Sequence, residues 1–542
     1  MFLPKLFTVL REGYGLGKFR ADAIAGLTVA IVALPLSMAI AIASGVGPER
    51  GIYTSIVGGL LVSLLGGSRY QIGGPAGAFI VLVLATVQQF GVDGLLLATM
   101  LAGLIMLAAG LLRLGAFVQF VPYPVTVGFT AGIAVIIFAS QIHDLLGLSL
   151  AGQEPGALLP KLLVLARALP SVSPAAVVVA LVTIVLIAVL RHYRPRWPVL
   201  LIAVTAAALV TRLAGLPIET IGSHFGGIPR SLPRPSLPPI SLERIRQVLP
   251  AAGAFALLGS IESLLSAVVA DSMSGGRHRP NMELVAQGVA NLVSPLFGGI
   301  TVTGAIARTA TNVRAGSRGP VSGLLHSVFL LLFMFIAAPL AGYIPLAALA
   351  GVLVTVAWNM AERHAFASLL RTSWGDAIVV VATFGVTLLW SLTEGIVTGI
   401  CLSALIFLRR MAQSALVEHV GEERPGETLI GDVVTVRITG AFFFGSAGVV
   451  AAALERIAAQ PKAYVLDMTD LAALDSSAAA ALRAFVGRAR RAGEAVYIAG
   501  APRPVRRMLL GQGLRSPEIQ FADTADAARS RFLRRGAAAV AG

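Results

Sequence analysis

One ionisable side chain lies within a long apolar stretch of this chain: Glu262, in the sequence Gly259-Ser-Ile-Glu-Ser-Leu-Leu-Ser266. Carboxylates in apolar membrane segments are rare and usually functional. Burial disfavours the charged form of a carboxyl group, so Glu262 would take up a proton near neutral pH. Ser266 follows four residues later, on the same helical face. We predict proton coupling at Glu262 and Ser266. The alternative is a structural carboxylate that accepts hydrogen bonds from a broken helix.

Two short glycine-rich interruptions divide otherwise apolar sequence, at residues 72–78 and 297–305. Broken helices at corresponding places in two halves are typical of a transporter's substrate site. Unwound backbone is tolerated at membrane depth only where protein or water satisfies its polar groups. A helix that restarts there directs free N–H groups and the positive end of its dipole into the cavity, which favours an anion.

The composition is that of a membrane protein with many crossings. The chain has 542 residues, of which 56% are hydrophobic and 13% charged. Its net charge of +15 is better explained by arginine-rich cytoplasmic loops than by nucleic-acid binding, because no basic patch is interleaved with aromatic residues. The lone Cys401 excludes an intrachain disulfide and a cysteine metal cluster. We find no P-loop, metal spacing or catalytic constellation, so we expect no cofactor, no bound metal and no enzyme activity.

Fourteen apolar stretches are predicted to lie in the bilayer, some of them only part-way across. They are 23–45, 51–67, 74–90, 94–112, 121–142, 173–190, 197–213, 249–270, 283–297, 302–313, 320–340, 344–359, 376–391 and 395–408. With an even number, both termini share one side. The arginine clusters at 191–196, 277–279 and 409–410 fall on that side. The positive-inside rule therefore places both termini in the cytoplasm, with the chain in the cytoplasmic (inner) membrane.

The pattern changes after Arg410 to alternating strands and helices, which indicates a small soluble α/β domain. The predicted elements are strands at 433–439, 463–468 and 495–499 and helices at 447–459, 477–492 and 504–511. The domains expected are therefore a membrane domain at 1–412, a linker at 413–430 and the α/β domain at 431–542.

Three motifs in order resemble the SulP anion permease family. The first runs from Asp22-Ala-Ile-Ala-Gly through Leu34-Pro35-Leu to Gly74-Pro75. The second is Gly299-Ile-Thr-Val-Thr-Gly-Ala-Ile-Ala-Arg308-Thr. The third is Leu474-Asp-Ser-Ser477, in a region similar to the STAS domain that this family carries. The resemblance covers nearly the whole chain.

The resemblance implies 14 membrane segments in two inverted repeats of seven, with a core domain that moves against a gate domain, and a homodimer. It places the substrate between the starts of the third and tenth segments. The residues implied to line the anion site, through backbone N–H groups or as its wall, are Ala76, Gly77, Ala78, Gly304, Ala305, Ile306, Arg308 and Leu36. Small residues at these positions could instead only pack helices. Arg308 could instead pair with Glu262 or face the cytoplasmic vestibule.

Relatives in this family carry sulfate, bicarbonate or C4-dicarboxylates such as fumarate and succinate. Na⁺-coupled bicarbonate relatives have a threonine where Ile306 aligns, and the loss of that hydroxyl favours protons as the coupling ion. We expect a proton-coupled anion symporter for a C4-dicarboxylate or sulfate. The alternatives are a Na⁺-coupled bicarbonate transporter, an uncoupled anion channel or exchanger on the same fold, and a membrane-anchored signalling scaffold.

The serine pair Ser476 and Ser477 resembles the phosphorylation loop of STAS-type anti-sigma antagonists. A phosphate at a helix N-terminus is electrostatically tolerated. Simple N-capping is the alternative and is favoured, because Ala478 replaces the glycine expected after the serines. The sequence does not identify a cytosolic partner for this domain.

Overall fold

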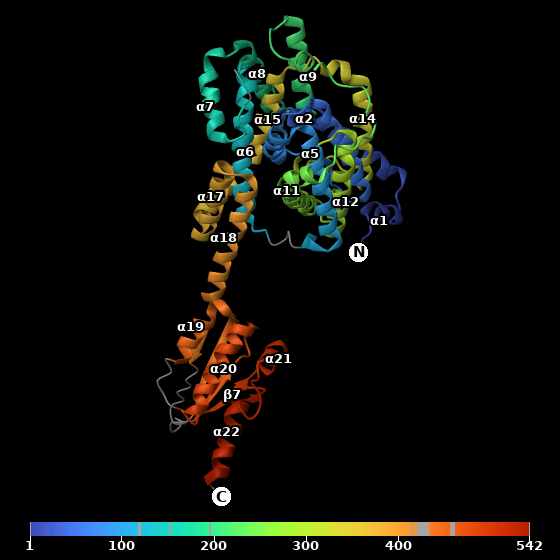
Figure 1. The fold of residues 1–542 in the computed structure, drawn as a ribbon. Coiled ribbons are helices and arrows are strands. Elements are labelled where there is room, and N and C mark those ends of the chain that lie inside the picture. The colour runs from blue at the N-terminus through green and yellow to red at the C-terminus, as the bar shows by residue number, and fades with distance from the viewer. Residues whose placement is uncertain are drawn as a thin grey trace. The chain divides into compact units, whose positions relative to one another are not determined.

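The computed structural model describes residues 2–116, 121–150, 152, 154–194, 197–413, 416–419, 433–455 and 461–540. The chain divides into two compact units, Met1–Ile400 and Cys401–Gly542. Figure 1 traces the chain through both, from the N-terminus in blue to the C-terminus in red.

The first unit is helical. Its principal helices are α1 (Lys5–Arg11), α2 (Leu16–Ala43), α3 (Pro48–Tyr53), α4 (Gly59–Leu65), α5 (Ile80–Leu111), α6 (Tyr123–Leu146), α7 (Leu158–Ala168), α8 (Pro174–Tyr193), α9 (Val199–Ala214), α10 (Ile221–Phe225), α11 (Leu242–Ser274), α12 (Pro280–Val293), α13 (Ile306–Arg314), α14 (Val321–Ala341), α15 (Leu346–Met360), α16 (Arg363–Thr372) and α17 (Trp374–Leu389). Helix α18 (Leu392–Gln413) follows them. Seven helices in the described part of the chain are long and apolar enough to cross a membrane.

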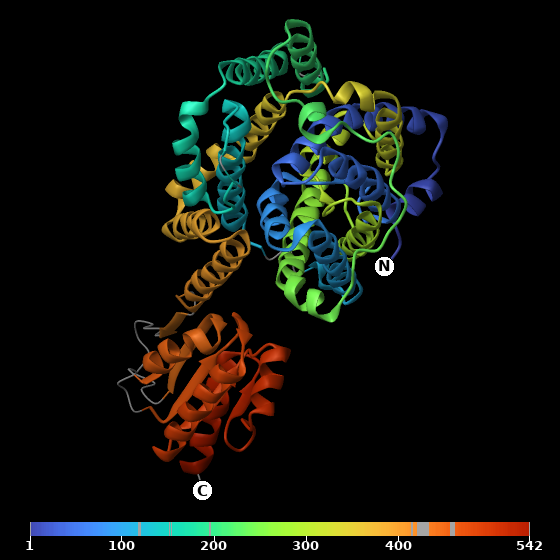
Figure 2. The ribbon, with the colours of Figure 1, turned by 45° about the horizontal axis from the view of Figure 1, so that its top comes forward.

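These helices form two groups, which Figures 1 and 2 show side by side. In one group α11 and α12 pack on α5, and α14 packs on α2. In the other, α15 and α17 pack on α6, and α8 packs on α15. The apolar side chains left on the outside of these helices, such as Phe335, Ile336 and Val182, are exposed as expected for a surface in contact with lipid.

The two segments predicted at 74–90 and 94–112 both lie largely within α5, where a kink at Gly91 divides them into two helices. Gly91 has φ +71°, a conformation that favours glycine, and it lies in the short connection expected at 91–93. A glycine in this conformation interrupts the regular helical backbone, as the predicted break between the two segments requires.

The glycine-rich interruptions form two very short strands. β1 (Gly73–Gly74) pairs antiparallel with β2 (Thr303–Gly304), so that Gly73 lies opposite Gly304 and Gly74 opposite Thr303. A 3₁₀ turn at Gly77–Phe79 leads from β1 into α5, and α13 starts directly after β2 and Ala305. The two breaks predicted from the sequence therefore meet in space.

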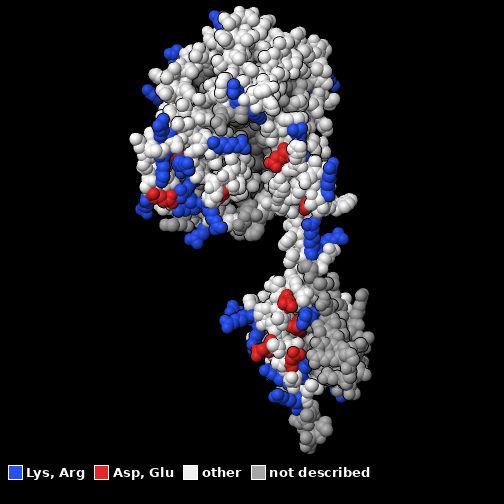
Figure 3. Space-filling model, turned by 180° about the vertical axis from the view of Figure 1, so that it is seen from behind, with Lys and Arg blue, Asp and Glu red and all other residues white. Residues whose placement is uncertain are grey.

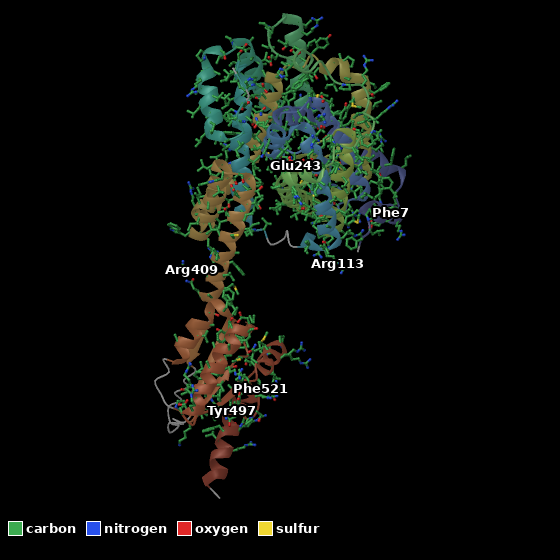
Figure 4. The ribbon with its side chains drawn as sticks, viewed as in Figure 1. Phe7, Arg113, Glu243, Arg409, Tyr497 and Phe521 are labelled. Atoms are coloured by element: carbon green, nitrogen blue, oxygen red, sulfur yellow. The ribbon has the colours of Figure 1, made fainter. Side chains whose placement is uncertain are left out.

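The second unit contains a sheet in the order β3-β4-β5-β7-β8, with β6 also beside β4. Its strands are β3 (Leu416–His419), β4 (Val433–Phe442), β5 (Ala463–Asp467), β6 (Leu471–Leu474), β7 (Ala495–Ala499) and β8 (Gln520–Ala522). Its helices are α19 (Phe444–Glu455), α20 (Ser476–Arg491), α21 (Arg503–Gly511) and α22 (Ala525–Val540). Figure 4 labels Tyr497 and Phe521 on the neighbouring strands β7 and β8.

Alternate strand residues of this sheet enter two separate cores. Val436, Ile438 and Leu466 pack with α20 and α21 on one face. Val465 and Tyr497 pack with α22 on the other. Such alternation is the period of a pleated strand covered on both faces.

Strand β3 lies inside the range that the sequence analysis assigned to a linker, 413–430. It pairs antiparallel with β4, with Leu416 opposite Thr439. The boundary predicted at residue 431 is therefore too late for the sheet. A four-residue edge strand is too short to give a clear alternation signal. Most of the rest of the predicted linker lies outside the described residues.

Candidate anion-binding site

The unwound backbone before each helix start is held by buried side chains. Thr309 Oγ1 accepts from the Ile72 N–H at 3.1 Å, and Ser263 Oγ accepts from the Gly304 N–H at 3.0 Å. Asn291 bonds both backbone groups of Val302, at 2.8 Å each. These contacts satisfy polar groups that would otherwise be costly at membrane depth.

The helix starts themselves keep amide donors available. The Ala305 N–H is used by the Ile72 carbonyl at 2.9 Å. The first-turn amides of α13, at Ile306, Ala307 and Arg308, have no acceptor within the helix. Within the described part of the chain, no carbonyl accepts from them or from the amides of Gly77 and Ala78. Two sets of N–H donors at the ends of two dipoles are suited to bind an anion.

One cavity of about 350 Å³ reaches both helix starts. Ala78 and Ile306 line it at the breaks, and Glu262 lines it from α11. The opposite wall is largely apolar and comes from α6, α15 and α18: Phe129, Ile133, Met360 and Ile396. The cavity therefore brings together the helix starts, the carboxyl groups of Glu262 and Glu362, and a largely apolar wall.

The carboxyl group of Glu262 has an incomplete set of partners. Its side chain is partly accessible, as expected of a cavity-lining group. Its Oε2 atom is buried and has no hydrogen-bond partner among the described residues. A buried carboxylate oxygen without a donor is costly when charged, and that cost is removed when a proton binds.

Arg308 lies behind β1. Its side chain is 1% exposed. Nη1 donates to Ser55 Oγ at 3.0 Å and Nη2 to Ser37 Oγ at 2.9 Å. Among the described residues no carboxylate lies within ion-pair distance of Arg308, so the alternative of a salt bridge to Glu262 is not what the structure contains. A buried guanidinium whose hydrogen-bond partners among the described residues are hydroxyl groups and the Pro75 carbonyl leaves positive charge close to the helix starts.

Ser266 is buried and does not line the cavity that Glu262 lines. It donates through Oγ to Thr309 Oγ1 at 3.1 Å, and Thr309 in turn accepts from Ile72. The structure thus places Ser266 in the support of the first break. The four-residue spacing put both side chains on one helix, but the direction of each depends on the packing around it.

The other predicted lining residues are not part of the wall of this cavity. Ala76 and Ala305 are buried, 5% and 8% exposed. A Cβ on Gly77 would meet Ile137 and Met360, whereas one on Gly304 would collide with Gln71. Leu36 packs in the hydrophobic core around α2.

Glu283 was missed as a supporting residue. It is fully buried at the start of α12, and its carboxylate accepts from the N–H groups of Gly67 and Ser68, at 2.8 and 3.0 Å, and from Gln71 at 2.9 Å. It therefore fixes the chain that leads into β1. The sequence offered one signal for Glu283, which is its position at the edge of the apolar stretch 283–297. A charged residue in such a position usually marks only the end of a helix.

Paired broken helices, converging amide dipoles and an unbalanced buried arginine define a membrane anion transporter. Residues 19–383 match the sulfate permease family and residues 428–528 match the STAS domain. The chain belongs to the sulfate permease family, as its sequence motifs predicted, and carries a C-terminal STAS domain.

Relatives and solved structures agree with this assignment. YvdB of Bacillus subtilis, a provisionally assigned sulfate transporter, is 41% identical over 508 residues, covering 93% of this chain and 95% of YvdB. The bicarbonate transporter BicA of Synechocystis is 31% identical, covering 90% of each chain.

The transmembrane domain of a cyanobacterial BicA superposes with a TM-score of 0.64 at 30% identity, covering 71% of this chain and 98% of that one. Murine Slc26a9, an anion transporter solved in its inward-facing state, superposes with a TM-score of 0.84 at 18% identity. The match covers 94% of this chain and 90% of Slc26a9, and it shows that the two share a fold. The predicted helical membrane fold with a STAS domain is confirmed.

Proposed function

We propose that this protein is a proton-coupled secondary active anion transporter, a symporter. The anion binds between the starts of α5 and α13, and the proton binds Glu262. The observation that carries the proposal is the single cavity lined by Ala78, Ile306 and Glu262. An anion and a proton that enter the same space would be bound together.

The anion site combines short-range and long-range attraction. The amides of Gly77, Ala78 and Ile306 supply hydrogen-bond donors, while Arg308 supplies charge from behind β1. The guanidinium is fixed by Ser37 and Ser55, so it contributes to the electrostatic potential of the cavity without contacting the substrate. A low-dielectric surrounding makes that charge more effective than it would be in water.

Protons are favoured over Na⁺ by the oxygen ligands at hand. A hard cation requires several oxygen atoms, yet Ile306 has none in its side chain and the Ser266 hydroxyl is engaged by Thr309. The kinship with BicA supports the second candidate, a Na⁺-coupled bicarbonate transporter. An uncoupled channel or exchanger on the same fold is the third.

The apolar wall favours an organic anion. Phe129, Ile133 and Ile396 could pack on the carbon chain of a C4-dicarboxylate such as fumarate or succinate while the amides hold a carboxylate. Sulfate, the substrate class named for YvdB, is the alternative.

We further propose fourteen membrane segments, location in the cytoplasmic membrane with both termini in the cytoplasm, and a homodimer. Figure 3 shows the first unit largely white on this face, with Lys and Arg gathered mainly on its lower half. Such a one-sided distribution of cations supports the orientation.

In the STAS domain, Asp475 rather than a serine caps α20. Its Oδ1 accepts from the Ala478 N–H at 2.8 Å, and its Oδ2 accepts from the Phe444 N–H at 2.9 Å. Ser476 and Ser477 are exposed beside this cap. Their hydroxyl groups are therefore accessible to a kinase, which keeps phosphorylation as a proposal.

The decisive experiment measures uptake by purified protein in liposomes. Fumarate, succinate, sulfate and bicarbonate are offered in turn, with a pH gradient or a Na⁺ gradient imposed separately. We expect one of the first three to accumulate under an inward proton gradient, with loss of accumulation on adding a protonophore. Accumulation driven by Na⁺ alone would establish the second candidate, and movement that only equalises concentrations would establish the third.

A further inference from the structure

A second hollow lies on the outer surface of the group that contains α6, α8 and α15. It has a volume of about 920 Å³, at the upper end of the range for pockets that hold small molecules. Val135 and Phe138 of α6 and Ile184 and Ile187 of α8 form much of its wall. Both helices are long and apolar enough to cross a membrane. The hollow therefore opens on the hydrocarbon of the bilayer, away from the cavity that contains Glu262.

The polar residues of this hollow are gathered at one end. Arg191 and His192 are in the last turn of α8, and Trp358, Asn359 and Arg363 are at the end of α15 and just beyond it. Ile184 precedes Arg191 by seven residues, about 10 Å along the helix axis. The hollow thus changes from apolar to basic over about a third of the thickness of the hydrocarbon core.

The basic end has an excess of positive charge. Its lining includes no Asp or Glu, and Glu362, next to Arg363, lines the other cavity. Neither Arg191 nor Arg363 has a carboxylate within ion-pair distance in the part of the chain that is described. Arg363 lies over the ring of Trp358 at 3.9 Å, which fixes one guanidinium at the mouth.

We propose that this hollow binds an anionic phospholipid. The phosphate of the headgroup lies between Arg191 and Arg363, and an acyl chain lies along Val135, Phe138 and Ile187. Basic pockets between membrane helices are suited to anionic headgroups. A soluble anion would be attracted by the two guanidinium groups but would leave the long apolar part of the hollow empty. A zwitterionic lipid would fill the apolar part but carries no net charge to attract the guanidinium groups.

The test follows quenching of Trp358 by lipids that carry bromine on their acyl chains. The full-length protein is prepared with Trp197, Trp374 and Trp390 changed to Phe, so that Trp358 is the only reporter. Brominated phosphatidylglycerol and brominated phosphatidylcholine are titrated separately in mixed micelles. We expect brominated phosphatidylglycerol to quench half of the Trp358 fluorescence at a mole fraction about tenfold lower than brominated phosphatidylcholine requires.

Three variants separate charge from folding. R191Q/R363Q should lose the preference for phosphatidylglycerol, and R191K/R363K should keep it. Ala188→Phe, which fills the hollow from its exposed side, should weaken quenching by both lipids. R113Q is the control, because Arg113 is exposed at the far end of α5 (Figure 4) and should leave both titrations unchanged.

Equal quenching by both lipids in the parent protein would overturn the proposal. So would a preference that survives in R191Q/R363Q, or one that is lost in R191K/R363K. Protection of Trp358 from both lipids would mean that a second copy of the chain covers the hollow, which would also overturn it. None of these outcomes depends on which anion is transported.

Discussion

The guanidinium of Arg308 lies directly against the backbone of Gly74, so closely that a Cβ at Gly74 would collide with Nη1. The same guanidinium reaches the Pro75 carbonyl at 3.5 Å. Arg308 of α13 is thus in contact with the first break, although more than two hundred residues of sequence separate them. A change in the position of Arg308 is therefore expected to change the backbone of that break.

We predict that removing the charge of Arg308 weakens anion binding by at least tenfold. Arg308→Gln keeps a hydrogen-bond donor for Ser37 or Ser55 but loses the charge, whereas Arg308→Lys keeps the charge. A tenfold change corresponds to about 1.4 kcal/mol, modest for one uncompensated charge in a low-dielectric site. For each variant, both the substrate dissociation constant and the thermal unfolding temperature are measured. Equal loss of affinity in both variants, or lost stability with unchanged affinity, would assign Arg308 a purely structural role.

Ala78→Leu should block substrate binding with the fold retained. Ala78 lines the cavity at the start of the helix, and a larger side chain would occupy the space in front of its amide. Ala76→Leu and Ala305→Leu should block transport too, but with a loss of stability of about 1–3 kcal/mol, because both alanines are buried. Ala108→Leu, at an exposed position of α5, is the control. Normal uptake by a folded Ala78→Leu protein would place the site elsewhere.

Glu262→Gln should uncouple transport from protons. Glutamine imitates the protonated carboxyl group permanently, so the variant should bind substrate and exchange it across the membrane. It should no longer accumulate substrate when a pH gradient is imposed. The control is Glu394→Gln, since Glu394 is an exposed carboxylate at the start of α18. The proposal fails if the Glu262→Gln variant still follows the pH gradient at the wild-type rate.

A pH-dependent contribution to stability is predicted for Asp467 in the STAS domain. Burial opposes its ionisation, but hydrogen bonds from Thr469 and Arg437 hold the pKa of Asp467 below its usual value. Its carboxylate thus stabilises the fold above the unfolded-state pKa of about 4 and loses that effect as the pH falls through the lower, folded-state value.

Asp467→Asn should accordingly lower the free energy of unfolding by about 2 kcal/mol at pH 7, with the difference from wild type shrinking below about pH 4. Chemical unfolding of residues 413–542 at several pH values measures this. Asp526→Asn, at a side chain that is 92% exposed, should have little effect. A difference that is constant over the whole pH range would contradict the assignment.

Truncation after Arg410 should leave the anion site intact while lowering stable expression or transport rate. Every residue that lines the cavity precedes residue 400, and the STAS domain has cores of its own. Substrate binding by the purified truncated protein, normalised to folded material, is the measurement. Complete loss of binding in a well-folded truncation would contradict the prediction.

The order of residues within short segments was enough to predict those parts of the fold that depend on neighbouring residues in the sequence. Glycine-rich interruptions marked both breaks, because unwound backbone in a membrane needs small residues and has few alternatives. Glu262 was selected because a lone carboxyl group is conspicuous in an apolar stretch, and its role in coupling stays a prediction. The strands β5 and β7 were found because their residues are almost all apolar, as strands covered on both faces require.

Contacts between distant segments could not be predicted in this way. Ser37 and Ser55 gave no sign that they hold Arg308, which lies 271 and 253 residues away from them. Ser266 was predicted beside Glu262, and its hydrogen bond to Thr309 could not be foreseen, because Thr309 comes from another segment. Side-chain direction within a packed group of helices depends on neighbours that periodicity does not identify.

The two-residue ladder between β1 and β2 has a consequence for selectivity. Because backbone hydrogen bonds join the two breaks, the helix starts cannot separate without breaking that ladder. The spacing between their amide donors should then be the same whichever side of the membrane the cavity faces. The anion would meet one unchanging set of donors when it is captured and when it is released. Discrimination by size should therefore be equal from both sides of the membrane, and any difference in affinity between the sides must come from the apolar wall of α6, α15 and α18.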